Sequence, residues 1–171
     1  MAVEAVNNAG AAHTISVLVA DKPGVLVRVA TVFARRGFNI DSLAVSPAHQ
    51  KGLSRMTVVT HGKEEGVTQI VKQLDKLIDV VHVYDYAEMD VVSREMAIVK
   101  VRTPSDKRSA VMEVANIFRA KSVDIGKGSV VFEITGSSSK LDAFESMMDE
   151  FGIIEMMRTG KLILRRGETP T

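Results

Sequence analysis

The stretches that decide the fold are VATVFARRGFNI (residues 29–40) and VANIFRAKSVDI (residues 114–125), because the second repeats the first at an offset of 114 − 29 = 85. Val, Ala, Phe and Ile recur at matching positions. Farther along, Leu74-Asp75 matches Met148-Asp149 and Gly62 matches Gly136, both at an offset of 74. We therefore expect two copies of one supersecondary unit. The second copy is shorter by 85 − 74 = 11 residues, which we place in its second strand and the hairpin after it.

Hydrophobic periodicity gives the order of elements in the first copy. Residues 13–20 alternate apolar and polar side chains, as a half-buried strand does. Residues 25–33 carry apolar side chains on one helical face, and the helix is expected to end near Gly37. Further strands are expected at 38–46, 53–61 and 80–87, and a second helix carries an apolar stripe from Val67 to Ile78. The order is βαββαβ, typical of ferredoxin-like folds.

The second copy shows the same alternation in shorter form. We expect strands at 95–102 and 130–135, a helix at 107–121, a helix with Leu141, Phe144, Met148 and Phe151 inward, and closing strands at 153–157 and 161–164. The sequence thus predicts an α+β protein of two ferredoxin-like βαββαβ repeats. The expected domains are residues 13–88 and 95–166, with a boundary near 89–94 and flexible tails at 1–12 and 167–171.

Composition excludes several classes of function. The net charge of the 171 residues is +1, without the basic excess typical of a nucleic-acid binder, and the absence of cysteine excludes disulfide scaffolds and thiol chemistry. No apolar run approaches the ~18 residues of a membrane span, and the first dozen residues lack the features of a signal peptide. The four histidines show no metal-ligand spacing. We expect a soluble cytoplasmic protein that binds no nucleic acid, membrane or metal.

Asp21-Lys22-Pro23-Gly24 forms the loop between the first strand and the first helix. Backbone N–H groups at a helix N-terminus suit a carboxylate or phosphate, and Gly24 lets a ligand approach the backbone. Asp21 is expected to cap the helix or to bind an ammonium group. Asn39, expected beside this loop, adds a donor and an acceptor. Together these groups form a candidate site for a free amino acid, although Asp, Pro and Gly are also common in turns that bind nothing.

The second copy serves as an internal control. At the offset of 85, Asp106 matches Asp21, so both copies keep a candidate N-cap, whereas Arg108 replaces Pro23 and Ser109 replaces Gly24. The Pro-Gly pair is therefore a better candidate for function than for fold. Ser137-Ser138-Ser139 is expected to be a loop and a helix N-cap, because no His/Asp partner pattern accompanies it. We expect no catalytic residue.

Three motifs, DKPGVL (21–26), RGFNIDSL (36–43) and LSRMT (53–57), give the chain a specific resemblance to the regulatory (small) subunits of acetohydroxyacid synthase, also called acetolactate synthase. The resemblance covers about residues 13–166. It implies an N-terminal ACT domain, which is an amino-acid-sensing module, and a C-terminal ferredoxin-like domain. Asp21 stands where the family often has Asn, and Pro23 stands where Ser is common.

The resemblance implies a non-catalytic chain that activates a catalytic subunit and confers feedback inhibition by L-valine in branched-chain amino-acid biosynthesis. In the family, the catalytic subunit carries thiamine diphosphate, Mg²⁺ and FAD, so no cofactor is expected in this chain. ACT domains of the family pair side by side as a homodimer, with valine at the interface. The effector-site residues implied here are Asp21, Pro23, Gly24, Val25, Leu26, Asn39 and Ile40. Two alternatives remain: an ACT sensor that docks on another enzyme, and a small ferredoxin-like enzyme of phosphate chemistry.

Overall fold

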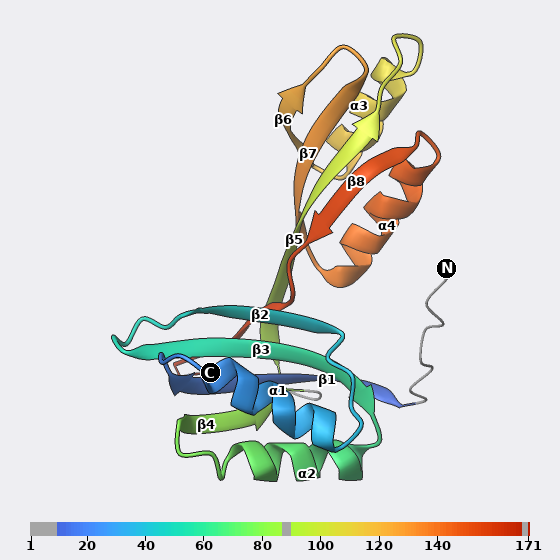
Figure 1. The fold of residues 1–171 in the computed structure, drawn as a ribbon. Coiled ribbons are helices and arrows are strands. Elements are labelled where there is room, and N and C mark those ends of the chain that lie inside the picture. The colour runs from blue at the N-terminus through green and yellow to red at the C-terminus, as the bar shows by residue number, and fades with distance from the viewer. Residues whose placement is uncertain (1–9, 87–89, 169–170) are drawn as a thin grey trace. The chain divides into compact units, whose positions relative to one another are not determined.

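The computed structural model describes residues 10–86, 90–168 and 171, and Figure 1 shows the strands and helices that it contains. The chain forms two compact units. The first unit contains the chain up to Val92 together with Gly160–Thr171, and the second contains Ser93–Thr159. The expected boundary at 89–94 falls partly outside the described residues, because residue 89 is among those that are not described.

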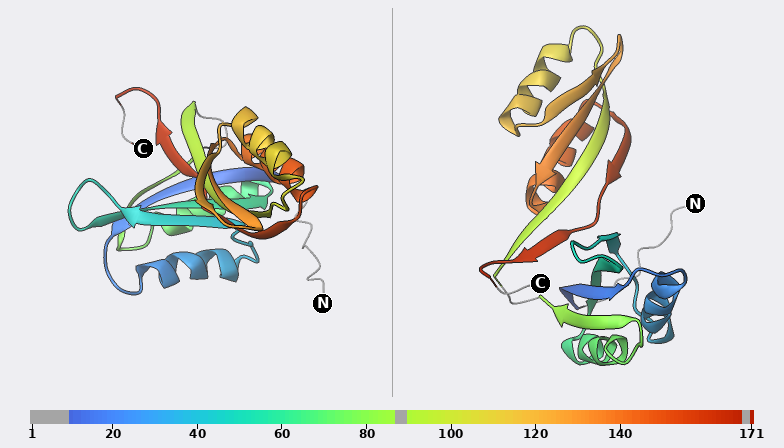
Figure 2. Two further views of the ribbon diagram at one scale, coloured as in Figure 1. Left: turned by 90° about the horizontal axis from the view of Figure 1, so that it is seen from above. Right: turned by 90° about the vertical axis from the view of Figure 1, so that its left-hand side faces the viewer.

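The first unit is a four-stranded antiparallel sheet with two helices on one face (Figure 2). Its sheet order is β2-β3-β1-β4. The elements are β1 (Ala11–Ala20), α1 (Val25–Arg35), β2 (Ser42–Pro47), β3 (Leu53–Gly62), α2 (Glu64–Leu74) and β4 (Val80–Asp85). Alternate residues of β1 and β3 meet one face of each helix in a single core, whose members include Ile15, Val17, Val19, Val29, Phe33, Val58, Ile70 and Leu74.

The second unit repeats this architecture with the sheet order β6-β7-β5-β8. Its elements are β5 (Val91–Arg102), α3 (Arg108–Ile117), β6 (Lys121–Ile125), β7 (Ser129–Gly136), α4 (Ser138–Asp149) and β8 (Ile153–Arg158). The last strand, β9 (Leu162–Arg165), pairs with β5. The core includes Val99, Val101, Val111, Phe132, Ile134, Phe144 and Met148. The two βαββαβ repeats are therefore confirmed.

The repeat extends to an irregularity in the strand pairing. The register of β1 against β4 shifts between Leu18 and Val19, and that of β5 against β8 shifts between Lys100 and Val101. These shifts lie 100 − 18 = 82 residues apart, whereas the helices align in sequence at 85. The residues with positive φ that follow the first helix of each unit, Gly37 and Arg119, also lie 119 − 37 = 82 residues apart, so the two structures correspond at an offset of 82. This difference in offset changes which loop residues correspond.

Two expected element boundaries are wrong. The strand expected to start at Phe38 begins only at Ser42, because Gly37 adopts φ 69° and the N–H of Phe38 donates to Phe33 O (3.0 Å), which closes the helix with a turn. The helix expected over 107–121 ends at Ile117, and Arg119 turns the chain with φ 55°. Lys121–Ile125 then forms β6, so the second strand of the repeat is retained.

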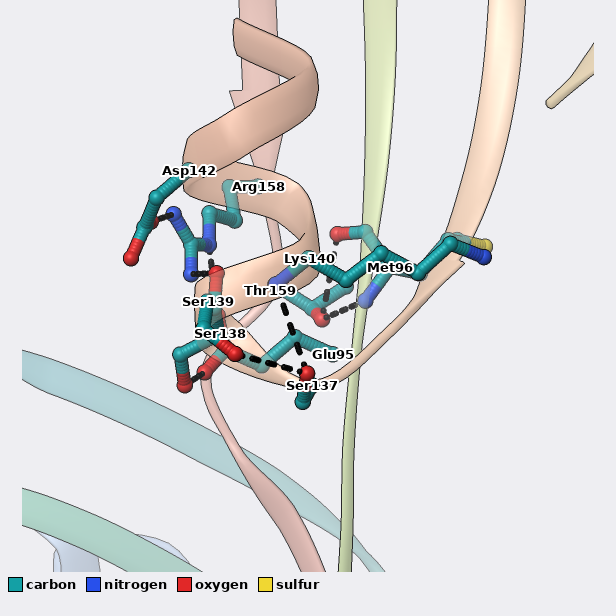
Figure 3. A network of polar contacts seen from close by, with 9 residues as sticks. All are labelled: Glu95, Met96, Ser137, Ser138, Ser139, Lys140, Asp142, Arg158 and Thr159. Carbon is teal, nitrogen blue, oxygen red and sulfur yellow. Dashed lines mark hydrogen bonds and ion pairs between the residues drawn. The ribbon is translucent and has the colours of Figure 1, made fainter. Parts of the chain in front are cut away.

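A buried polar network ties α4 to β5 and β8 in the second unit (Figure 3). Glu95, which is 5% exposed, accepts hydrogen bonds from Ser138 Oγ and from Arg158 Nε, the latter at 2.5 Å. Arg158 also donates to Asp142 Oδ1 at 2.5 Å. Ser137 accepts from the N–H of Lys140 at 3.3 Å and is the N-cap of α4, as expected. The network therefore fixes the start of α4 on the sheet.

The end of the chain returns to the first unit. Ile163 of β9 and Thr171 are buried there, and Thr171 O lies 3.1 Å from His82 Nε2. From the sequence, residues 161–164 are expected in the second domain and residues 167–171 in a tail. Residues 169–170 of that tail and residues 1–9 of the expected N-terminal tail lie outside the described residues. None of the helices in the described part of the chain has the length and apolar character that crossing a membrane requires.

Candidate effector site

The loop Asp21–Gly24 lies at one end of the first sheet, between two other loops of the same unit. The N–H of Asp21 donates to Gly52 O (2.9 Å) in the β2–β3 hairpin. The N–H of the preceding residue, Ala20, donates to Asp79 O (2.8 Å) in the connection from α2 to β4. These two bonds fix the position of the loop, while Asp21, Lys22, Pro23 and Gly24 are all exposed. A ligand would therefore meet a defined but open surface.

Gly24 is the N-cap of α1, and no side chain caps this helix. Its φ of 84° and ψ of −10° lie in the left-handed region, which glycine adopts without steric cost. The prediction that Asp21 caps the helix is wrong, because Asp21 lies three residues before the N-cap. The chain closes this turn through the backbone instead, with the N–H of Val25 donating to Lys22 O (3.4 Å). The first turn of α1 thus presents uncapped backbone N–H groups beside a residue without a side chain.

The two residues after Gly24 differ in burial. Val25 is 2% exposed and packs in the core, where it anchors the start of α1. Leu26 is 41% exposed, so its side chain is an available apolar surface next to Gly24. The start of α1 is the positive end of its dipole, and the exposed Leu26 side chain lies next to it. Together they suit a ligand that carries both an anionic and an apolar group.

Asn39 and Ile40 lie at the other end of the same sheet. The Thr60 hydroxyl donates to Asn39 O (2.6 Å), and the Asn39 amide donates to Asp41 Oδ1 (2.7 Å). Ile40 packs against the core. The loop end of β1 pairs with Leu53, so Asn39 lies about seven residues along β3, or roughly 23 Å, from the loop. The expectation that Asn39 stands beside the loop of its own chain is wrong.

A cavity of about 370 Å³ lies at the Asn39 end rather than at the loop. It is lined by Gly37, Phe38, His61, Gly62, Lys63, Glu65 and Gly66. The sequence-predicted residues thus form two groups on one copy, with Asp21–Leu26 at one end of the sheet and Asn39-Ile40 at the other. One copy does not bring the two groups together.

The corresponding loop of the second unit is closed by a side chain. Thr103, and not Asp106, is the counterpart of Asp21, because its N–H donates to Gly128 O (2.9 Å) in the β6–β7 hairpin as that of Asp21 donates to Gly52 O. The N-cap of α3 is Lys107, so the prediction that Asp106 caps this helix is wrong. Arg108 Nη2 donates to Gly126 O (2.9 Å) and Lys127 O (2.6 Å), so its side chain is held on the carbonyls of the hairpin.

Arg28 and Asp79 were missed by reasoning from the sequence. Arg28 Nη2 lies 2.7 Å from Asp79 Oδ2, and this ion pair stands directly beside Gly24. The available signal was spacing, since side chains of a helix lean toward its N-terminus and Arg28 follows Gly24 by four residues. No local pattern in the sequence predicts the role of Asp79, because Asp79 lies 79 − 28 = 51 residues from Arg28.

Comparisons with known proteins match both halves of the chain. Residues 15–82 match the model of the "AHAS small subunit-like ACT domain", and residues 94–167 match that of the "Small subunit of acetolactate synthase". A probable acetolactate synthase small subunit of Archaeoglobus fulgidus is 47% identical over 91% of this chain and 97% of its own length. The acetolactate synthase small subunit of Mycolicibacterium smegmatis is 45% identical over 94% and 95%, respectively.

A solved structure leads to the same family. The crystal structure of the acetolactate synthase small subunit from Thermotoga maritima superposes with a TM-score of 0.83 at 38% identity, and covers 93% of this chain and 99% of that one. The likeness thus includes both units of the repeat and nearly the full length of each relative. The chain belongs to the family of acetolactate synthase small subunits.

Proposed function

We propose that this regulatory subunit activates the catalytic subunit of acetolactate synthase and makes it sensitive to L-valine. The observation that carries the proposal is the left-handed Gly24 at the N-terminus of α1. Helix α3 also has no side-chain cap, but its N-cap is Lys107, which has φ −104° and carries a side chain. A free amino acid suits this surface, since its carboxylate is attracted to the helix N-terminus and its side chain to Leu26. The exposed Asp21 carboxylate supplies a partner for the ammonium group.

The effector site is completed by a second copy of the chain. Strand β2 is an edge strand of the first sheet, paired on one side with β3. When two copies pair antiparallel through β2 about a two-fold axis, the start of one β2 meets the end of the other. Asn39 and Ile40 precede β2, and the hairpin that follows β2 contacts Asp21 through Gly52. The two-fold axis therefore moves Asn39 of one copy to the Asp21–Leu26 loop of the other.

Exposed apolar side chains at the same edge support this pairing. Leu43 and Val45 of β2 are 36% and 46% exposed, although they oppose the core residues Val58 and Met56 of β3. An edge strand that carries apolar side chains is prone to pair with another strand. Pairing of two β2 strands in a homodimer buries Leu43 and Val45, removes the unpaired edge and makes one eight-stranded sheet.

Regulation follows from a difference in affinity between two states of the holoenzyme. We propose that this chain binds no cofactor, and that thiamine diphosphate, Mg²⁺ and FAD belong to the catalytic subunit. Valine at the interface between two small subunits favours one dimer geometry over another. To change the holoenzyme from mostly active to mostly inhibited, valine must bind the inhibited state more tightly by a few kcal/mol.

The direct test is reconstitution with a catalytic subunit of acetolactate synthase. We expect acetolactate formation to rise when the chain is added, and L-valine to reverse that increase. Thermal unfolding of the chain with each of the twenty amino acids tests binding separately. Ligand at ~100 times its Kd adds about 2.7 kcal/mol, or several degrees in a chain of this size. Activation without any response to valine in either assay contradicts the effector role, and absence of activation contradicts the regulatory role.

A further inference from the structure

An ion pair holds a guanidinium group beside the proposed effector loop. Arg28 of α1 and Asp79 of the α2–β4 connection meet at 2.7 Å through Nη2 and Oδ2. The Asp79 side chain is 12% exposed, and its backbone carbonyl is fixed by the N–H of Ala20. The Arg28 side chain is 51% exposed. One side of the guanidinium is therefore anchored on a nearly buried carboxylate, and the other side meets solvent.

The free side of this guanidinium borders Gly24. A Cβ placed on Gly24 would lie 3.9 Å from Arg28 Nη1, and no other atom of the described chain outside the neighbouring residues lies within 4 Å of it. Arg28 is also joined to Gly24 through its backbone, since its N–H donates to Gly24 O (3.1 Å). The Nη1 donor thus borders the space that the absent side chain leaves open. A guanidinium presents its donors in a fixed fork that matches a carboxylate.

The second unit shows that the fold does not require this pair. The N–H of Arg102 donates to Gly152 O (2.9 Å), as the N–H of Ala20 donates to Asp79 O, so Gly152 is the counterpart of Asp79. A glycine there provides no carboxylate. The cation beside the second loop, Arg108, is hydrogen-bonded to the hairpin carbonyls instead. The anchored guanidinium therefore occurs in the unit that has the open glycine loop.

We propose that Arg28 binds the α-carboxylate of the effector through Nη1 and that Asp79 is the positioning residue that holds Arg28 there. This inference rests on the proposed function and deepens it, because it assigns recognition of the carboxylate to one side chain. The ligand class is then the free α-amino acid, and amides and esters of the same amino acid are excluded. A purely structural ion pair at this surface would contribute little to ligand choice.

The test compares L-valine with L-valinamide, which has the same side chain and ammonium group but no carboxylate. Calorimetric titration is done with the full chain at about pH 6, below the usual pKa of an α-amino group. For the unchanged chain we expect L-valine to bind about tenfold or more tightly than L-valinamide. Arg28→Gln should lose that preference by weakening L-valine binding alone. Asp79→Asn should lose part of it, and Arg35→Gln, an exposed arginine in the last turn of the same helix, should retain all of it.

The possible outcomes separate the two proposals. If the unchanged chain binds L-valine and Arg28→Gln binds it equally well, the role of Arg28 is overturned and the effector site stands. An equal loss for both ligands also overturns it, since that result means a structural role. If the unchanged chain binds neither ligand, the proposed effector function itself fails. Arg28→Lys, which keeps the charge without the fork, and thermal unfolding of each variant show that a loss of binding is not a loss of folding.

Discussion

The N–H of Asp21 donates to the carbonyl oxygen of Gly52 at 2.9 Å, which joins the β1–α1 loop to the hairpin that follows β2. This single bond places the loop at the end of β2, whereas Asn39 lies before its start. Two groups implied by one family resemblance are therefore at opposite ends of one sheet. The arrangement is explained if each effector site takes its loop from one copy and its asparagine from another.

Two substitutions at Gly24 distinguish the effect of a side chain's charge on ligand binding from the effect of its size. Gly24→Asp should abolish binding of L-valine, because the new carboxylate lies within reach of Arg28 and repels the carboxylate of the ligand. Activation of the catalytic subunit should remain. Gly24→Asn has nearly the same size and tolerates a positive φ, so it should weaken binding less. Both variants are measured by calorimetry and by the activity of the reconstituted enzyme. Valine inhibition that survives in Gly24→Asp would refute the placement of the site.

The β2 edge should control the association of two copies. Val45→Lys places a charge on this edge and should lower the dimer affinity at least tenfold, as measured by sedimentation velocity. Val81→Lys is the matched control, because Val81 lies on the opposite edge strand β4 and is 56% exposed. Both are surface substitutions, so the stability of the folded chain should change by no more than about 0.5 kcal/mol. A dimer weakened by Val81→Lys but not by Val45→Lys would assign the interface to β4.

The buried pair Glu95–Arg158 should be the ion pair of the second unit that matters most for stability. Arg158→Met leaves the Glu95 carboxylate buried without its cation, and we expect a loss of about 3–5 kcal/mol in the free energy of unfolding by urea. Lys100→Met breaks an exposed pair with Glu155 on the same sheet and should cost at most about 1 kcal/mol. Similar losses in the two variants would show that burial of Glu95 does not set the cost.

Stability of the first unit should fall at alkaline pH through Tyr86. Burial raises the pKa of Tyr86 above its ordinary value of 10.0, since the charged phenolate is poorly solvated there. Because the pKa is raised in the folded chain, the neutral Tyr86 side chain stabilises the folded state fully below about pH 10. This stabilisation is lost as the pH rises through the folded pKa. Tyr86→Phe should remove that part of the pH dependence. Tyrosine absorbance in Tyr84→Phe, which keeps Tyr86 alone, should show a late titration, and an ordinary midpoint would contradict the assignment.

Periodicity predicted most of the fold, and its failures have local causes. The apolar faces that end in Phe33 and Leu74 gave both helices of the first unit, because burial sets their spacing. Strand β6 was missed because the helix was expected to run to Lys121, whereas the left-handed Arg119 ends α3 early and the strand that follows is short and mostly exposed. The absence of a side-chain cap on α1 could not be predicted, since several loop residues are equally able to cap and the backbone turn selects among them.

The candidate site was predicted in its parts but not in its arrangement. Gly24 and Leu26 stand together as expected, because only Val25 separates them in the sequence. The position of Asn39 depends on the direction in which β2 runs across the sheet. Hydrophobic periodicity does not predict that direction. The Arg28–Asp79 pair depends on the fold as a whole, because it joins the first helix to the connection before β4.

The most direct test of a site shared by two copies is a mixing experiment. Chains with Gly24→Asp and chains with Asn39→Ala are each expected to bind no L-valine. In a mixed dimer, one site joins both defects, and the other joins an intact loop to an intact asparagine. Calorimetry on the unfolded and then jointly refolded mixture should therefore recover binding in about a quarter of all sites, from random pairing of two chains in a dimer. Recovery near this level supports the shared site, and no recovery in a mixture shown to contain mixed dimers would contradict it.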